Sequence, residues 1–230
     1  MAINNNYLCV YDLETTGFDP KTVYPIEVAA VILHPRKLTI VEGGNFWSRC
    51  RPPDYEASLS NLELWNFHAK ANNKSVDEIK QLVADAPPVS AVWGNFANFL
   101  ASYHADSTKR RSKFSAPIRC GHNIFKYDNI IFDRMCKEYG QSDKEGEQNI
   151  CHPRDTIDLL NICTLFFSNQ VEPQKYTLEV LRAYFGMKLD GAHTALCDVE
   201  DTSKILAKFI NYFWEIAKRT KFQGALAEIL

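Results

Sequence analysis

Short runs of apolar and β-branched residues dominate the first fifty positions of the chain. Gly, Pro and polar residues separate the runs "YLCVYDL" (7–13), "IEVAAVIL" (26–33) and "IVEGGNFWS" (40–48). Runs of this length between turn-forming residues are typical of sheet strands. The pattern predicts three strands in an antiparallel meander.

From about residue 58 the apolar positions recur at spacings of three and four, which is the period of an amphipathic helix. We expect one more strand at "PIRCGHN", leading directly into a helix, and a later helix that starts either at Asp155 as N-cap or after a very short strand. The order predicts an α/β domain with a mixed central sheet flanked by helices and a long C-terminal helix. The predicted helices cover 58–68, 75–86, 89–103, about 124–139, 155–167, 176–187 and about 194–218.

Length and composition favour a globular protein. With 230 residues, 46% of them hydrophobic, the chain can bury a core, and we expect a single domain over 1–230, with a core at about 6–216 and a C-terminal helical end at 217–230. The start "MAINNN" is polar, and no apolar run of about 18 residues follows. We therefore expect no membrane association and a cytoplasmic location.

Charge and cysteine content restrict the possible chemistry. A formal net charge of −2 argues against a surface covered in positive charge, so any grip on nucleic acid must be local. The basic run "KRRSK" (109–113) is interpreted as a solvated loop in preference to a phosphate-binding patch. Seven cysteines without a CxxC pair predict reduced thiols, mostly in the core, and no zinc ribbon or disulfide framework.

Two carboxylates stand where a buried strand should end. Asp12 and Glu14 in "YDLETTG" are two residues apart, so they project to the same face as Leu8 and Val10. Like charges so placed repel each other, and a divalent cation between them resolves the conflict most simply. A strand running out into a polar turn is the alternative.

A third carboxylate interrupts a predicted apolar helix face. Asp128 falls on the stripe formed by Ile124, Phe125, Ile131, Phe132 and Met135. Burying an unpaired carboxylate costs several kcal/mol, about 3–5 by mutational comparison. Asp133, by contrast, is expected on the solvated side with Asn129 and Lys137.

The last predicted helix carries a fourth carboxylate near its start. Asp198 lies on the stripe of Ala195, Thr202, Ile205, Phe209 and Ile216, but Asp201 is only moderately rotated from it, so periodicity leaves both possible. His193 is five residues before Asp198 and must come from a preceding loop, which Gly191 would allow. Next to a carboxylate cluster, it is a candidate general base.

These motifs together resemble a known family. "DLETTG", "HNIFKYD" and "HTALCD" are similar, in order and over residues 12–198, to the three motifs of the DEDD exonucleases, in particular the histidine-bearing DEDDh branch with polymerase proofreading subunits, oligoribonuclease and bacterial exonuclease I. The resemblance implies an RNase H-like fold and release of nucleoside 5′-monophosphates from 3′ ends of single-stranded nucleic acid, with DNA favoured over RNA.

The resemblance also implies a site. It assigns two Mg²⁺ or Mn²⁺ ions to Asp12, Glu14, Asp128 and Asp198, which favours Asp198 over Asp201, and gives His193 the role of activating water. Substrate contacts fall by position on Thr15, Thr16, Gly17 and Asn123.

One feature departs from the proofreading pattern. Asp128 follows Asn123 by five residues, as in exonuclease I, whereas proofreading subunits commonly have four. The long C-terminal extension of exonuclease I has no counterpart here, so its clamp on single-stranded DNA is not implied.

Several alternatives stay open at this point. They are an RNA-processing or oligoribonuclease-like enzyme, a silent binding module, and a phosphatase or small-nucleotide hydrolase with the same cluster. The sequence does not distinguish a monomer from a homodimer or a polymerase-associated subunit. Four aromatic residues could stack on bases, but core positions are favoured for them: Phe18, Trp47, Trp65 and Phe67.

Overall fold

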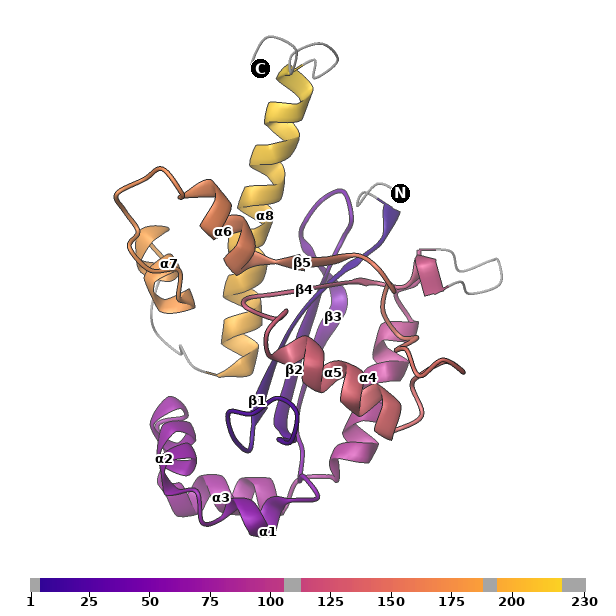
Figure 1. The fold of residues 1–230 in the computed structure, drawn as a ribbon, viewed down its shortest axis with the longest axis vertical. Helices are drawn as coiled ribbons and strands as arrows, with labels where there is room; N and C mark the ends of the chain where they lie inside the picture. Colours follow the sequence, from indigo (N-terminus) through magenta and orange to yellow (C-terminus); the bar gives the residue numbers. More distant parts are fainter. Residues whose placement is uncertain (1–4, 106–112, 188–193, 221–230) are drawn as a thin grey trace.

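The computed structural model describes residues 5–105, 113–187 and 194–220. Within them, five strands form one sheet in the order β3-β2-β1-β4-β5 (Figure 1). The first three strands pair antiparallel, whereas β4 and β5 run parallel to β1, so the predicted meander and mixed sheet are confirmed. The strands are β1 (Leu8–Thr15), β2 (Pro25–Leu33), β3 (Ile40–Arg49), β4 (Ile118–Gly121) and β5 (Thr156–Asp158).

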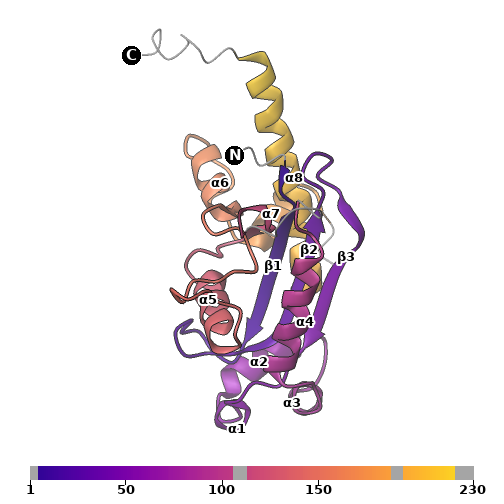
Figure 2. The ribbon, with the colours of Figure 1, turned by 90° about the vertical axis from the view of Figure 1, so that its right-hand side faces the viewer.

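Helices cover both faces of the sheet (Figure 2). On one face, Cys9, Tyr11 and Leu13 of β1 pack with aromatic residues of α4 and with α5. On the other face, Leu8 and Val10 pack against α8. The helices are α1 (Tyr55–Ser58), α2 (Leu62–Ala71), α3 (Val76–Ala84), α4 (Val89–Ala101), α5 (Asp128–Glu138), α6 (Leu159–Phe166), α7 (Leu178–Tyr184) and α8 (Ala195–Arg219), with a short 3₁₀ helix, η2, at Lys113–Ser115.

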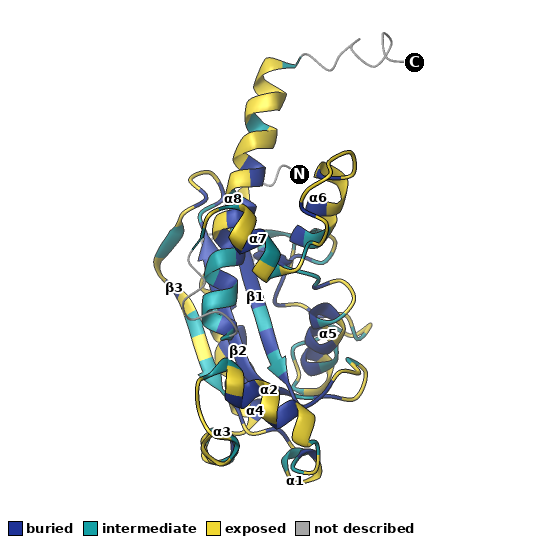
Figure 3. Ribbon diagram, turned by 90° about the vertical axis from the view of Figure 1, so that its left-hand side faces the viewer, coloured by how far each residue is buried: buried dark blue, intermediate teal, exposed yellow. Residues whose placement is uncertain are grey.

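The long C-terminal helix α8 is confirmed, and it serves two cores. Val199, Leu206 and Ile210 face the sheet, whereas Ile205 and Phe209 pack against α6 and α7. Beyond the sheet α8 projects from the body, where its surface is mostly exposed (Figure 3). The helix runs unbroken past residue 216 to Arg219, so the expected core boundary at 216/217 is not a structural break. None of the helices in the described ranges combines the length and apolar character that crossing a bilayer requires.

One predicted helix start is wrong, and for a second helix the structure decides between two alternatives. Helix α5 begins at Asp128 and not near residue 124, because residues 124–127 form turns that are held by bonds to another strand. The later helix follows a very short strand, β5, which confirms that alternative, and its N-cap is therefore not Asp155 but Asp158, whose side chain accepts from the Leu160 N–H. Pairing of β5 with β4 takes up residues that local pattern alone would put in a helix.

A third correction concerns the solvated side of α5. Asn129 was expected there, but it is buried and its Oδ1 accepts a 2.7 Å hydrogen bond from the hydroxyl of the core residue Tyr11. Asp133 is exposed as expected, and it pairs with Arg119 at 2.7 Å. Lys113 is the described part of the predicted basic loop and pairs with Asp143, whereas 109–112 lie outside the described residues.

Candidate active site

Asp12 and Glu14 lie where β1 ends, on the face that α8 covers. Their neighbours on that face, Leu8 and Val10, belong to the core shared with α8, which confirms that the four side chains share one side of the strand. Both carboxylates are half-buried, so solvent and ions can reach them. The strand is irregular after Glu14, where the register with β2 shifts, and the chain turns away there into the "TTG" segment.

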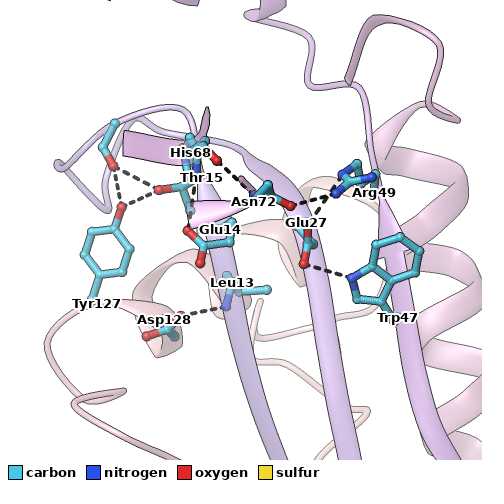
Figure 4. Close-up of polar contacts among 11 residues, drawn as sticks. Leu13, Glu14, Thr15, Glu27, Trp47, Arg49, His68, Asn72, Tyr127 and Asp128 are labelled. Atoms are coloured by element: carbon cyan, nitrogen blue, oxygen red, sulfur yellow. Dashed lines mark hydrogen bonds and ion pairs between the residues drawn. The ribbon is translucent and has the colours of Figure 1, made fainter. Parts of the chain in front are cut away.

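Asp128 reaches the same end of β1 from the opposite layer. It is the first residue of α5 and is buried, and its Oδ1 accepts a 3.2 Å hydrogen bond from the backbone N–H of Leu13, between Asp12 and Glu14 (Figure 4). A direct bond to the strand that carries the first two acids explains why a carboxylate is tolerated on the buried stripe of this helix.

Asp158 holds the segment between β4 and Asp128 in place. This buried carboxylate accepts from the backbone N–H groups of Asn123 at 2.8 Å and Phe125 at 3.1 Å, besides capping α6. Asn123 itself has a φ of 61°, in the left-handed region that asparagine tolerates. Asp158 was not among the predicted site residues, because the helix cap was expected at Asp155. An Asp directly before "LLNIC" is itself a cap signal.

Asp198 stands in the first turn of α8, whose N-cap is Thr194. Its Oδ1 accepts a 2.7 Å bond from Nη2 of Arg182, and Arg182 Nε binds Oδ2 of Asp201 at 2.8 Å. The charge of Asp198 raises the pKa of both Asp12 and Glu14. Arg182 binds both residues that periodicity left open, and the choice of Asp198 over Asp201 as a ligand stays a prediction.

The acids at this end of β1 repel one another. Burial raises the pKa of Asp12 well above its ordinary value, and Asp128, Glu14 and Asp198 raise it further. Burial raises the pKa of Glu14 from 4.5 to about 8, and the charge of Glu27 is the second-largest cause of this rise. Burial likewise raises the pKa of Asp128 from 3.8 to about 7, although its backbone hydrogen bonds oppose the shift. Negative charge therefore dominates at this end of β1.

A hard divalent cation suits this cluster by donor type and by charge. All four acids offer carboxylate oxygens, the donors that Mg²⁺ and Mn²⁺ prefer, and the raised pKa values of Asp12, Glu14 and Asp128 indicate a negative field at these three groups. In the conformation described, however, no three His, Cys, Asp or Glu side chains among the described residues are already gathered closely enough to hold one ion. The two-ion assignment therefore stays a prediction.

A fifth acid lies beside Glu14 on the neighbouring strand (Figure 4). Glu27 pairs with Glu14 in the β1–β2 register and is buried. The Trp47 Nε1–H donates to it at 2.8 Å, and Arg49 Nε lies 3.6 Å from its other oxygen. Each carboxylate oxygen of Glu27 thus has a partner on β3, and Glu27 affects Glu14 through its charge. The sequence offered no signal for it, since strand register is a tertiary property.

His68 of α2 contacts the opposite side of Glu14. Its Nδ1 lies 3.5 Å from Glu14 Oε2, and its Nε2 lies 3.1 Å from the Thr15 carbonyl (Figure 4). Burial lowers the pKa of His68 and raises the pKa of Glu14, and both shifts disfavour an ion pair at this contact. The carbonyl contact assigns the proton to Nε2 and leaves Nδ1 to face the carboxyl group.

The "TTG" turn is stabilised from within. Three contacts of 2.5–2.9 Å join Thr15 Oγ1, the Tyr127 hydroxyl and the Gly17 carbonyl to one another (Figure 4). The carbonyl accepts in two of these contacts, and the third joins the two hydroxyl groups. Thr16 Oγ1 donates to Asp54 Oδ2 at 2.9 Å. A Cβ on Gly17 would come within 2.9 Å of the Val23 side chain. Both threonine side chains are buried in these contacts, so a ligand would meet chiefly the backbone of this turn.

The remaining predicted residues divide into two groups. His193 lies outside the described residues. Of the four aromatics expected in the core, Trp65 is fully buried, but Phe18, Phe67 and Trp47 are exposed, so the prediction is wrong for these three. Phe18 directly follows the "TTG" turn and Phe67 packs edge-on to His68, which brings two exposed rings to the acidic end of the sheet.

Solved structures of nucleases share this architecture. No protein-family model and no curated protein sequence matches the chain. Exonuclease I from E. coli, in a zinc-bound complex with single-stranded DNA, superposes with a TM-score of 0.64 at 15% identity, covering 91% of this chain and 43% of that one. Cell-death related nuclease 4 (CRN-4) gives 0.62 at 16% identity, with 90% and 64% covered. The fold is RNase H-like.

Exonuclease I from Methylocaldum szegediense gives a similar result, with a TM-score of 0.61 at 15% identity and 91% and 43% coverage. The chain thus spans less than half the length of the exonuclease I chains and just under two thirds of CRN-4. At these identities the comparison establishes the RNase H-like fold, and it confirms the sheet and the long C-terminal helix expected from the sequence.

The raised pKa values predict an unusual dependence of stability on pH without metal. Between the ordinary pKa of Glu14 or Asp128 and the raised one, about 8 or about 7, the folded state binds more protons than the unfolded state. Stability that is fully present below pH 4 should therefore be lost as pH rises toward 8, by up to about 1.4 kcal/mol per pH unit for each group. Urea unfolding in EDTA at several pH values measures this loss.

Glu14→Gln provides the comparison for that experiment. The variant should lose less stability between pH 5 and pH 8 than the wild type, because one of the titrating groups is gone. Equal losses in the two proteins would contradict the assignment of a raised pKa to Glu14.

Proposed function

We propose that this protein is a metal-dependent 3′ to 5′ exonuclease of the DEDDh type that releases nucleoside 5′-monophosphates from single-stranded nucleic acid, with DNA preferred to RNA. The proposal is carried by three acids at one end of β1, where Asp128 of α5 bonds to the Leu13 N–H between Asp12 and Glu14, and by the electrostatic effect of Asp198 on Asp12 and Glu14. Their mutual repulsion is what a site for divalent cations is expected to show when no cation is bound.

The surroundings of the acids support a nucleic acid as the substrate. The exposed rings of Phe18 and Phe67 flank the acidic end of the sheet and could stack on bases, as aromatic residues do in proteins that bind single strands. The "TTG" turn offers backbone groups beside the same acids. The RNase H-like fold, which this chain shares with exonuclease I and CRN-4, adds a likeness of architecture.

Each residue then has a chemical task. Asp12, Glu14, Asp128 and Asp198 hold two Mg²⁺ or Mn²⁺ ions, which when bound supply Lewis acidity and neutralise charge on the attacking and leaving oxygens. His193 accepts the proton of the attacking water. The backbone of Thr15, Thr16 and Gly17 holds the 3′-terminal nucleotide. Asn123, whose backbone N–H donates to Asp158, contacts the substrate with its side chain.

The direction of digestion provides the test. A 3′-phosphate on a single-stranded oligonucleotide is expected to block digestion in Mg²⁺, because the backbone of the "TTG" turn is proposed to hold the 3′-terminal nucleotide, whereas a 5′-phosphate should have no effect. Chromatography of the products should show nucleoside 5′-monophosphates, and EDTA should abolish their release.

Three outcomes would contradict the proposal. Fragments cut from a circular single strand would indicate an endonuclease, and inorganic phosphate released from free nucleotides would indicate a phosphatase. Faster digestion of a matched RNA than of the DNA would reverse the proposed preference and favour an oligoribonuclease-like or RNA-processing enzyme.

A further inference from the structure

Arg182 places a positive charge on one of the four acids. Arg182 of α7 is 1% exposed, and its guanidinium is shared between two acids of α8, with Nη2 bound to Asp198 and Nε bound to Asp201. Among the ion pairs of the described residues, this is the one that places a guanidinium on a proposed metal ligand, whereas the pair at Glu14 is formed by the imidazole of His68.

Arg182 joins two acids of α8 that have different surroundings. Nζ of Lys204 lies 2.9 Å from the second oxygen of Asp201. Asp198, with Arg182 on its Oδ1, acts electrostatically on Asp12 and Glu14. The guanidinium therefore places a positive charge on the acid that α8 supplies to the proposed cluster.

We propose that Arg182 is a built-in counter-cation that holds Asp198 in place when no metal is bound and weakens the binding of divalent cations there. The inference rests on the proposed function, which makes Asp198 a ligand. A cation approaching Asp198 meets a carboxylate with one oxygen already bound to a positive charge, and the two cations repel across a poorly hydrated site. Arg182 is too deeply buried to touch the substrate, so it is a positioning residue.

The bond to Arg182 bears on one acid of the proposed cluster. No three of the four acids are gathered as a ready metal cage in the described conformation, and Arg182 contacts Asp198 among them. Metal binding at Asp198 would require this carboxylate to be shared with Arg182 or released from it. The apparent affinity for the metal would then be lower by the fraction of Asp198 that is released.

Binding of Mn²⁺ to the full chain without nucleic acid tests the inference. Isothermal titration calorimetry at one pH should show that Arg182→Gln binds Mn²⁺ about tenfold more tightly than the wild type, because a unit charge a few ångströms from the ligand is removed. Arg182→Lys keeps the charge and should bind like the wild type. Tighter binding by both variants would overturn the inference, because it would not depend on charge.

Asp201→Asn gives a second test with the opposite sign. It removes the acid that shares Arg182, so the guanidinium acts on Asp198 alone. Because the loss of any nearby acid lowers the attraction for a cation, Mn²⁺ should bind more weakly to this variant than to Glu200→Gln, which removes an acid of the same helix outside the Arg182 ion pairs. This variant keeps Arg182 in place and decides the question if Arg182→Gln does not fold, which circular dichroism would reveal.

The outcomes separate this inference from the proposed function. Unchanged or weaker Mn²⁺ binding by folded Arg182→Gln, or equal binding by Asp201→Asn and Glu200→Gln, would leave Arg182 as a structural link between α7 and α8. Failure of the wild type to bind Mn²⁺ at all would overturn both this inference and the proposed metal site.

Discussion

Replacing Asp128 by Asn is expected to slow the digestion of a single-stranded oligonucleotide by more than about 100-fold, since groups that merely orient metal ligands already cost 10- to 100-fold. The fold should survive, because Asn retains the Oδ1 that accepts from the Leu13 N–H. In EDTA near pH 8 the variant should melt at the same temperature as the wild type or higher, because burial and the neighbouring Asp158 disfavour the charge of Asp128. Initial rates in Mg²⁺ and thermal melting measure the two effects.

Asp133→Asn is the matched control on the same helix. Asp133 has a side chain that is 52% exposed, and it pairs with Arg119 away from the site, so its loss should leave the rate within about twofold of the wild type, as is usual for surface changes. Wild-type digestion by Asp128→Asn would remove Asp128 from the proposed cluster. A loss of activity that accompanies unfolding would leave Asp128 with a structural role.

His193→Ala is expected to slow cleavage by about 100-fold or more, the usual effect of losing a general base, while leaving Mn²⁺ affinity unchanged. Oligonucleotide binding measured in Ca²⁺ should also be preserved. The wild-type rate should rise with pH through the titration of an imidazole whose ordinary pKa is about 6.5, and the variant should lose that rise. Single-turnover rates from pH 5.5 to 9 measure this profile.

His104→Ala controls for loss of an imidazole elsewhere. His104 follows α4 and contacts Ser115 at 3.2 Å, so this variant should keep both the rate and its pH profile. If His193→Ala weakened Mn²⁺ binding as strongly as Asp198→Asn does, His193 would be a ligand and not a base. An unchanged rate would make it a residue without a role in turnover.

The periodicity of the sequence was sufficient to predict most of the architecture. The near-continuous apolar runs at 7–13 and 26–33 indicate strands with apolar neighbours on both faces, and the structure buries most of β1 and every residue of β2. The three-and-four spacing after residue 194 predicted α8 to within one residue at each end. Such patterns succeed because they record which side of an element faces the core.

The same reasoning failed where a distant segment altered the local preference. The stripe containing Ile124 and Phe125 predicted a helix from 124, but the bonds from Asp158 to Asn123 and Phe125 hold turns there until Asp128. Phe18 and Phe67 were expected in the core because large aromatic residues are usually buried, yet they are 71% and 52% exposed beside the acidic end of the sheet. Neither outcome is contained in the local pattern.

The sequence by itself determined that Asp12 and Glu14 share one face of β1, that Asp128 interrupts a buried stripe, and that Asp198 or Asp201 heads the last helix. These are properties of one element at a time, set by the 2.0 and 3.6 residue periods. The tertiary structure alone decided what surrounds the acids, including Glu27 through the register of β2, Asp158 through β5, and His68 and Arg182 through helices. Such contacts join residues 13 to 54 positions apart, and a local period carries no information about which neighbour packs against a face.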